Sequence, residues 1–470
     1  MSSQWTWVDV SYDLPVDPKQ SDKATAIKLL SFRRPHMRAF HFAWFGFCMA
    51  FVCWFAFAPL MNVIMEDLSM TKAEVYDANI SSVASTVLSR LIVGPFCDTY
   101  GARLISSSLL IMGAIPTAFG GLVQSATDVT AIRFFVGIMG ATFVCNQYWS
   151  SQMFAKEIVG TANATAAGWG SLGGGVAQIF MIVIWRAFAT KYDAETAWRL
   201  SFLVPAAIVM VVAVGQVFLT DDCPKGNYND LIANNAMPPV LLRIGNQTAL
   251  NSRRTIFFPT LFDTVPFLPL SMANDYTAQG YLNFNSWVMF VQYAACFGVE
   301  LTINNTAAAY FEDNFGLSME KAGLVASLFG LMNVFSRSLG GFYSGKLMSA
   351  GVTGMRGRFI AQWTALLWEG VFLCVFSRQT ELVPAIACLL LFALGVQAAE
   401  GTSYSIVPYI CPQATGAVSG IVGAGGNLGA TIWGLIFRFG PAVEQEVYLI
   451  LGVIVIGLSM ITPLFNIRGY

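Results

Sequence analysis

Long apolar stretches recur along this chain, and they limit its possible folds more than any other feature. A helix needs about 20 apolar residues to cross a bilayer core of about 30 Å, and stretches of about 20 to 26 residues meet that length. They begin near His41, Tyr76, Leu104, Val129, Ala162 and Leu200, and again near Phe284, Glu320, Phe359, Glu381, Gln413 and Val447. The sequence therefore predicts an all-α membrane protein with twelve transmembrane helices, because lipid leaves irregular backbone without hydrogen-bond partners.

The composition agrees with a membrane protein and argues against several other classes. Of the 470 residues, 56% are hydrophobic and 11% are charged, and the mean hydropathy is +0.60, which is more apolar than one soluble core requires. A net charge of -1 gives no overall attraction for nucleic acid, so no nucleic-acid partner is expected. The cysteines form no C-x-x-C pair and only two histidines occur, so we expect apolar packing rather than a disulfide or metal framework, and no cofactor.

A polar segment over residues 220–283 separates two groups of six apolar stretches. It carries acids, bases and prolines, and it cannot remain in hydrocarbon as irregular backbone. We expect an N-terminal segment over 1–40, six-helix halves over 41–219 and 284–467, the segment 220–283 as a central linker, and a short tail over 468–470. The piece over 255–272 is apolar but broken by prolines, which predicts a segment along the membrane interface or a re-entrant turn. No cleavable signal peptide is evident, so the first apolar stretch is expected to be an uncleaved anchor.

The positions of lysine and arginine predict the orientation, because basic residues resist translocation. With a cytoplasmic N-terminus, sixteen of the 26 basic residues lie on the cytoplasmic side and seven lie outside. Both termini and the linker are therefore predicted to be cytoplasmic. The sequon at Asn79 would then lie near an outside loop, where it is open to glycosylation.

An internal repeat relates the two groups of helices. Ser89-Arg90 has a counterpart in Ser336-Arg337, at an offset of 247 residues, and Gly-Ser-Leu-Gly at 170–173 has one in Gly-Asn-Leu-Gly at 426–429, at an offset of 256. Similar offsets in corresponding helices indicate two pseudo-symmetric six-helix halves. Transporters built from such halves bind their substrate near the membrane midplane, where the repeats meet.

Three arginines, Arg90, Arg133 and Arg337, fall inside apolar stretches. A charge there costs about 2.5 to 3.5 kcal/mol, and arginine cannot lose its charge to escape that cost. Arg90 lies about 21 Å along a helix that starts near Tyr76, well inside the bilayer. No acid lies at helical spacing from Arg90 or Arg337, so both are predicted to be unpaired and functional. Arg133 lies near the outer end of its helix and is expected to extend to the interface.

Two guanidinium groups at repeat-related positions predict an anion site between the halves. Each presents parallel N–H donors that match a planar oxyanion. Nitrate, nitrite, carboxylates and phosphate all fit the charge, and the shape of a compact pocket favours a small ion. Tyr293 and Phe297 are four residues apart on one helical face and could stack on a flat ion, although such aromatic pairs often serve packing alone.

Two glycine-rich segments, 166–175 and 423–430, allow helix backbones to approach closely, because glycine has no side chain to hold them apart. Packing explains the glycines but not a polar amide among them. Asn427 can donate to an oxyanion, and Ser171 can do so more weakly. An interhelical hydrogen bond is an equal alternative for Asn427.

The loop after the second apolar stretch reads GPFCDTYGAR and resembles the signature loop of the major facilitator superfamily. It forms a tight turn in which an acid and a base could act as a latch. The loop and its degenerate counterpart in the second half supply Gly94, Asp98, Gly101 and Arg103, and Gly341 and Gly345. The resemblance implies a gating role, in which these pairs stabilise the outward-facing state and break on opening.

Within that superfamily, six segments between residues 40 and 465 resemble the nitrate/nitrite porter family, and most closely the high-affinity nitrate transporters of plants, algae and fungi. They are SRLIVGPFCD (89–98), ATFVCNQYWSSQMF (141–154), AAGWGSLGGG (166–175), YAACFGVEL (293–301), AAEGTSYSIVPYI (398–410) and GAGGNLGA (423–430). The resemblance implies the major facilitator fold and transport of nitrate and nitrite. It also implies substrate contacts from Arg90, Arg337, Tyr293, Phe297, Asn427, Ser171 and Trp169. The family usually carries asparagine where this chain has Ser171, so selectivity or affinity is expected to differ.

The resemblance to eukaryotic members further implies proton-driven uptake at the plasma membrane. A symporter needs a group that changes its protonation, and Glu300 and Glu400 are the intramembrane acids that qualify. Nitrate/nitrite exchange, as in some bacterial relatives, is the alternative. Besides nitrate, protons and lipid, the resemblance to some plant members suggests a single-span accessory protein as a partner.

Two other functional classes stay open at this stage. A carrier of small carboxylates would use the same charges, and a nutrient receptor could keep the transporter fold while signalling through its linker. An enzyme is not expected, because the sequence has no H-E-x-x-H motif, no Walker-type glycine loop and no Ser/His/Asp set.

Overall fold

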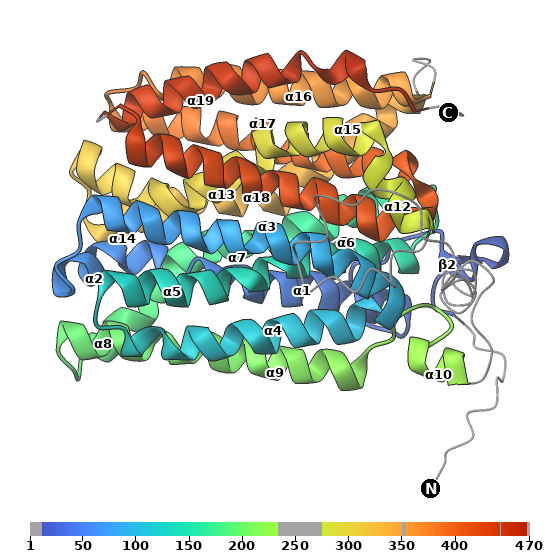
Figure 1. Ribbon diagram of the computed structural model, residues 1–470, viewed down its shortest axis with the longest axis horizontal. Coiled ribbons are helices and arrows are strands. Elements are labelled where there is room, and N and C mark those ends of the chain that lie inside the picture. The colour runs from blue at the N-terminus through green and yellow to red at the C-terminus, as the bar shows by residue number, and fades with distance from the viewer. Residues whose placement is uncertain (1–11, 234–274, 350–353, 442, 468–470) are drawn as a thin grey trace, which may run out of the picture.

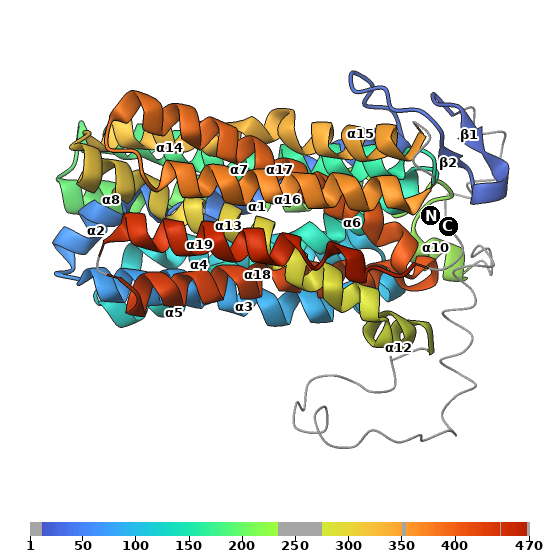
Figure 2. The ribbon, with the colours of Figure 1, turned by 90° about the horizontal axis from the view of Figure 1, so that it is seen from above.

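The protein is an elongated helical bundle whose helices run along its long axis (Figures 1 and 2). This computed structural model describes residues 12–233, 275–349, 354–441 and 443–467. Within these residues, twelve helical segments are long and apolar enough to cross a membrane. The prediction of an all-α protein with twelve transmembrane helices is therefore confirmed. The piece predicted to lie along the interface, 255–272, falls outside the described residues.

Six spans form the N-terminal half, and short 3-10 turns interrupt several of them. In chain order its elements are α1 (His36–Trp54), η2 (Ala58–Leu60), α2 (Met61–Asp67), α3 (Lys72–Tyr100), α4 (Ala102–Phe119), η3 (Gly120–Leu122), α5 (Ala126–Gly137), η4 (Ile138–Ala141), α6 (Thr142–Met153), α7 (Val159–Ala189), α8 (Ala194–Ser201) and α9 (Leu203–Leu219).

Six further spans form the C-terminal half. Its elements are α13 (Phe284–Phe315), α14 (Met319–Leu331), η6 (Met332–Val334), α15 (Ser336–Ser349), α16 (Met355–Phe376), α17 (Leu382–Ile410), η7 (Pro412–Ala414), α18 (Thr415–Phe439), α19 (Glu444–Ser459) and η8 (Thr462–Leu464).

One end of the bundle carries the extra elements, and we name it the linker end; the opposite end is the far end. At the linker end lie the short helices α10 (Tyr228–Ala233) and α12 (Asp275–Leu282) and the turn η1 (Pro18–Gln20). An antiparallel pair of two-residue strands, β1 (Val16–Asp17) and β2 (Lys23–Ala24), lies beside them (Figure 2).

The predicted helix starts lie within six residues of the observed ones, and most were placed too late in the chain. The difference comes from polar residues in the first turn, which a hydropathy pattern leaves out. Thr71 and Glu74 form a capping box at the start of α3, and Asp193 caps α8 by accepting from Thr196 N–H. The N-terminal segment was expected to extend to residue 40, but α1 begins at His36.

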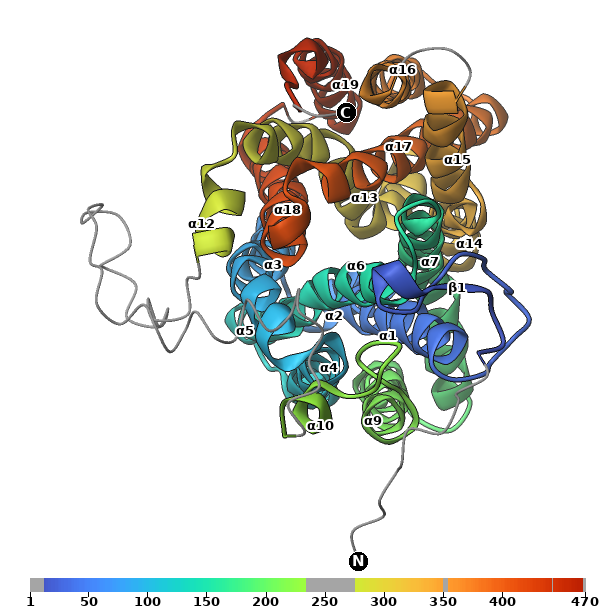
Figure 3. The same ribbon diagram turned by 90° about the vertical axis from the view of Figure 1, so that its right-hand side faces the viewer.

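The two halves meet along α3 with α18 and along α7 with α14, α15 and α17. Figure 3, which looks onto the linker end, shows the N-terminal half below and the C-terminal half above. The contact between α3 and α18 is close because it uses glycine on both sides. A Cβ at Gly94 would lie 2.6 Å from the Gly416 carbonyl oxygen, and a Cβ at Gly420 would lie 2.7 Å from the Arg90 carbonyl oxygen. This approach brings Arg90 against the C-terminal half.

Candidate functional site

Arg90 lies on α3, is fully buried, and points into the interface between the halves. Its Nε and Nη2 donate to the Gly140 carbonyl at 3.2 and 3.0 Å, and its Nη1 donates to the Gly423 carbonyl of α18 at 2.8 Å. No described residue forms an ion pair with it, which agrees with the prediction of an unpaired arginine. Two of its five N–H groups are left for another acceptor.

Arg337 lies on α15 and is also fully buried, but it is not unpaired. Its Nη1 is 2.7 Å from Glu400 Oε2 and donates to Ser171 Oγ at 2.9 Å, and its Nη2 donates to Tyr293 Oη at 2.7 Å. The expectation that no acid pairs with Arg337 is therefore wrong. Glu400 comes from α17, and helical spacing within one segment cannot reveal a partner on another helix. The Nε of Arg337 has no hydrogen-bond partner in the described part of the protein.

Aromatic rings surround both guanidinium groups. Arg90 Cζ lies 4.7 Å from the Phe143 centroid and 4.8 Å from the Phe297 centroid, and Arg337 Cζ lies 5.6 and 5.8 Å from the same two rings. Tyr293 stacks on Phe297 at 5.1 Å with an interplanar angle of 12°. Such contacts stabilise the cations by about 0.5 to 2 kcal/mol each. Together with Tyr404, described next, these residues form what we name the arginine cage.

Phe143 and Tyr404 complete the cage, and neither was singled out from the sequence. Tyr404 meets Phe143 edge-on at 5.0 Å and Tyr293 at 5.2 Å. Both residues lie in segments that carried the family resemblance, but their spacing on α6 and α17 gives no sign that they face the arginines. Every side chain of the cage is fully buried, so the structure is closed toward both ends of the bundle.

The charges of the cage sum to one positive charge. Arg90 and Arg337 are close enough to repel each other, and Glu400 balances one of them. The unused donors are two N–H groups on Arg90 and, on Arg337, the Nε–H with one Nη2–H. A buried site with one net positive charge and spare planar donors is suited to a small monovalent oxyanion.

The other residues predicted to contact substrate occupy different positions. Ser171 reaches the cage through Arg337. Asn427 is fully buried, but its Nδ2 donates to Gly423 of its own helix at 3.1 Å, and no described residue bonds to its Oδ1. Trp169 packs edge-on against Phe40 and Trp44 and donates to the Val334 carbonyl, so it is not part of the cage.

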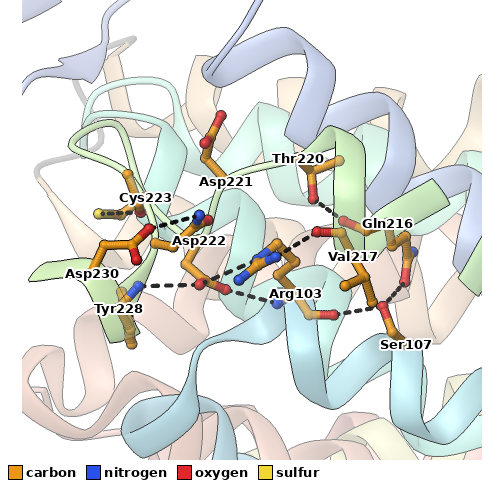
Figure 4. Close-up of polar contacts among 12 residues, drawn as sticks. Arg103, Ser107, Gln216, Val217, Thr220, Asp221, Asp222, Cys223, Tyr228 and Asp230 are labelled. Carbon is orange, nitrogen blue, oxygen red and sulfur yellow. Dashed lines mark hydrogen bonds and ion pairs between the residues drawn. The ribbon is translucent and has the colours of Figure 1, made fainter. Parts of the chain in front are cut away.

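The predicted latch after α3 uses a different acid from the one expected. Figure 4 shows Arg103 facing Asp222, which follows α9: Arg103 N–H donates to Asp222 Oδ1 at 3.1 Å and Nε lies 3.5 Å from Oδ2. Burial raises the pKa of Asp222, while Arg103 and backbone N–H donors lower it. Gly101 has a φ of 84° and would place a Cβ 2.4 Å from Asp222 Oδ1, so the turn requires glycine. Asp98, the expected partner of Arg103, lies instead against Gly416 of α18, 2.7 Å from a Cβ built there.

Gly341 and Gly345, the counterparts of the latch residues in the C-terminal half, also lie toward the linker end. A Cβ at Gly341 would lie 3.0 Å from Ala164 Cβ of α7, so this position is part of the contact between the halves. A Cβ at Gly345 would meet nothing within 4 Å, so close packing gives no reason for glycine there.

Three charged contacts join the halves at the far end. Lys72 pairs with Asp313 at 2.5 Å, Arg438 pairs with Asp77 at 3.0 Å, and Arg186 pairs with Glu320. These pairs are partly exposed, so each one is weak on its own.

Arg133 of α5 does not extend to the membrane interface as expected. It is 1% exposed and donates to Asn79 Oδ1 and, at 2.8 Å, to Asn305 Oδ1 of α13. Arg133 stays inside the bundle because Asn305 of the other half accepts its hydrogen bond. The sequence of one helix does not indicate a partner on another helix. Asn79 is consequently tied to this buried contact.

The predicted proton-coupling acids are both fully buried in the C-terminal half. Glu400 pairs with Arg337, and Glu300 Oε1 accepts from Asn333 Nδ2 at 3.3 Å. A third buried acid, Glu369 of α16, was missed because it falls among apolar residues with no motif around it.

Comparisons with known proteins show the family and the fold of the chain. A family model described as the Major Facilitator Superfamily matches residues 43–434. The chain is 36% identical to the high affinity nitrate transporter 2.5 of Arabidopsis thaliana over 96% of this chain and 83% of that protein. It is 35% identical to the nitrate transporter 2.2 of Chlamydomonas reinhardtii, over 93% and 79%. It is 27% identical to the nitrate/nitrite transporter NrtP of Nostoc punctiforme, over 88% and 89%.

Among solved structures, a bacterial homologue of the human lysosomal transporter Spinster in an inward-facing conformation superposes with a TM-score of 0.59 and 15% identity. The aligned region covers 92% of this chain and 96% of that one, which supports the fold. Twelve membrane-spanning helices in two halves, the family match and the identity to plant and algal relatives all agree. The chain therefore belongs to the Major Facilitator Superfamily, in the family of the high-affinity nitrate transporters.

Proposed function

We propose that this protein is a secondary active transporter of nitrate, and that nitrite shares its site. The observation that carries the proposal is the arginine cage, which holds one net positive charge between the two halves. Relatives named as nitrate transporters cover more than nine-tenths of the chain, which supports nitrate over a carboxylate as the substrate.

In the proposed complex, the anion lies between Arg90 and Arg337. The spare N–H groups of both forks donate to its oxygens, and the rings of Phe143, Tyr293 and Phe297 form flat walls beside it. A planar ion of one charge satisfies these donors without leaving excess charge between the arginines. Rotation of the Asn427 amide would add an N–H donor from α18.

Transport then follows from alternate opening of the two ends of the bundle. Opening at the far end breaks the ion pairs of Lys72, Arg186 and Arg438 with the other half. Opening at the linker end separates α3 from α18 near Gly94 and Gly416. The distribution of basic residues supports a cytoplasmic linker end and cytoplasmic termini, and a plasma-membrane location follows from the family resemblance.

Proton coupling is proposed to act through the pair of Arg337 and Glu400. An anion bound at Arg337 repels the Glu400 carboxylate, so anion binding favours protonation of Glu400. By linkage, protonation favours anion binding by the same factor. The proton therefore enters with nitrate, and Glu300 lies beside Glu400 as a second acceptor.

Nitrate/nitrite exchange is the second candidate, because relatives such as the Nostoc protein are named for both ions. In an exchanger, Glu400 would keep its charge throughout the cycle, and uptake would require internal nitrite. Dependence on a single-span accessory protein is a separate expectation, and co-purification with flux measurements would test it.

The proposal is tested by nitrate flux in liposomes that contain the purified protein. Arg90→Lys and Arg337→Lys keep the charge and lose the planar fork, so transport should fall by at least about tenfold. Arg378→Lys, at an exposed position outside the cage, is the matched control and should transport normally. If the parent protein moves no more nitrate than empty liposomes do, a receptor is favoured over a transporter. If both cage variants transport nitrate as fast as the parent, the arginine cage does not bind the transported anion.

A further inference from the structure

Three carboxyl groups lie together inside the C-terminal half, away from the contact between α3 and α18. Glu300 of α13, Glu369 of α16 and Glu400 of α17 are all fully buried. Glu300 and Glu400 are within hydrogen-bonding reach, and Glu369 interacts electrostatically with both. Arg337 is the cation that pairs with the group, through Glu400.

Glu369 is the member that the anion site does not explain. Both of its carboxyl oxygens are buried and have no hydrogen-bond partner among the residues that the structure describes. Its backbone is packed tightly, because a Cβ at Gly395 of α17 would lie 2.8 Å from Glu369 N. An ionised carboxylate in such a place would cost several kcal/mol, so Glu369 holds a proton in this conformation.

Within the described part of the chain, the neighbours of Glu369 offer no positive charge that could replace that proton. From α13 the titratable groups near it are Glu300 and Cys296, and from α17 it is Glu400. From α15 the charged group is Arg337, which Glu400 already occupies.

Helix α19 also packs against α16 beside Glu369. The two helices meet at Gly370, the residue after Glu369, where a Cβ would lie 2.9 Å from the Gly452 carbonyl oxygen. The tyrosine of α19, Tyr448, bonds to Thr306 instead of reaching this group. Arg337 therefore balances the charge of Glu400, and Glu369 keeps its proton because none of these neighbours brings a cation to it.

We propose that Glu369 is a proton-carrying residue of the transport cycle, which receives through Glu300 the proton that enters at Glu400. This rests on the proton-coupled function proposed above. Glu369 gives up its proton toward the linker end, the proton on Glu400 moves to Glu300, and Glu300 passes it on to Glu369. Each transfer breaks one O–H bond and forms another, no electrons move, and the Arg337–Glu400 ion pair is restored.

A polar route toward the linker end is available on the same helix. Gln362 lies two turns before Glu369, about 10.5 Å along α16, on the same helical face. Its Oε1 accepts from Thr402 at 2.5 Å and from Ser403 at 3.2 Å, whereas its buried Nε2 has no partner among the described ranges. The proton path thus runs within the C-terminal half and is separate from the anion path between the halves.

Glu369→Gln tests the proposal in liposomes, because it removes the exchangeable proton and keeps the shape. Nitrate accumulation driven by a pH gradient should fall by about tenfold or more, while nitrate–nitrate exchange at equal pH should stay within about twofold of the parent. Glu381→Gln, at an exposed position at the start of α17, is the control and should leave both rates unchanged.

Infrared spectra add a readout that does not depend on transport. The carbonyl band of protonated carboxylic acids should be present in the parent protein at pH 7 and should weaken in Glu369→Gln. An unchanged band would overturn the assignment of a proton to Glu369.

Two transport results would also overturn the proposal: normal gradient-driven accumulation in Glu369→Gln, or an equal loss of accumulation and exchange, which marks a structural role. If the parent moves nitrate without protons, the proposed coupling fails as well. That result is distinguishable, because it appears in the parent before any substitution.

Discussion

Replacing Arg337 by glutamine should cost stability in a way that depends on pH. The substitution leaves Glu400, which is fully buried, without the cation that lies 2.7 Å away. Removing one partner of a buried ion pair typically lowers the free energy of unfolding by about 3 to 5 kcal/mol. The orphaned glutamate can instead take up a proton, and for a glutamate with an ordinary pKa of about 4.3 this costs about 3.7 kcal/mol at pH 7. The smaller cost sets the outcome, so Arg337→Gln should lose about 3 to 4 kcal/mol at pH 7.

The same reasoning gives the pH dependence. Each unit of lower pH reduces the cost of protonation by about 1.4 kcal/mol, so the loss that depends on Glu400 should fall to about 1 kcal/mol at pH 5. Glu400→Gln added to Arg337→Gln should abolish this pH-dependent part, because no carboxylate remains to be protonated. The hydrogen bonds of Arg337 to Ser171 and Tyr293 contribute a loss that does not depend on pH.

The free energy of unfolding of the purified protein, measured at pH 7 and pH 5 for the parent, both single variants and the double variant, checks this prediction. Arg438→Gln, which breaks a partly exposed pair with Asp77, is the control and should lose less than about 1 kcal/mol at either pH. An Arg337→Gln loss that is the same at both pH values and unchanged by Glu400→Gln would refute the buried ion pair.

Three further predictions concern other parts of the structure. Gly426→Ala would place a Cβ 2.5 Å from Phe297 Cδ1, so it should reduce nitrate uptake in liposomes and destabilise the protein by about 1 to 3 kcal/mol. Asp222→Asn removes the buried charge partner of Arg103, so the free energy of unfolding should fall by about 1 to 3 kcal/mol, whereas an unchanged value would show that the latch contributes nothing. Burial, with Lys156 nearby, lowers the pKa of Lys23 to about 8. The unfolded chain binds the Lys23 proton up to higher pH, so the thermal stability of the parent relative to Lys23→Met should rise between about pH 8 and pH 10.5, and a flat difference would contradict this.

The sequence alone predicts the helices well, because apolar length and the bilayer thickness leave few alternatives. Twelve spans and two halves follow from hydropathy and from the repeat that relates Arg90 to Arg337. The helix starts were less accurate, because capping residues such as Thr71 and Asp193 are polar and belong to the helix ends.

Contacts between different helices could not be predicted from residue spacing in the sequence. Glu400 approaches Arg337 from α17, and Asn305 reaches Arg133 from α13. Each of these pairs joins residues more than 60 positions apart, so no periodicity within one segment indicates them. Glu369 was missed for the same reason, because its closeness to Glu300 and Glu400 appears only when α13, α16 and α17 are packed together.

The central claim is that Arg90 and Arg337 hold the transported anion together. An experimental structure of the purified protein saturated with nitrate tests it most directly. We predict flat density between the two guanidinium groups, with its oxygens about 2.7 to 2.9 Å from N–H groups of both arginines. Nitrate bound elsewhere, or held by only one of the two arginines, would contradict the account.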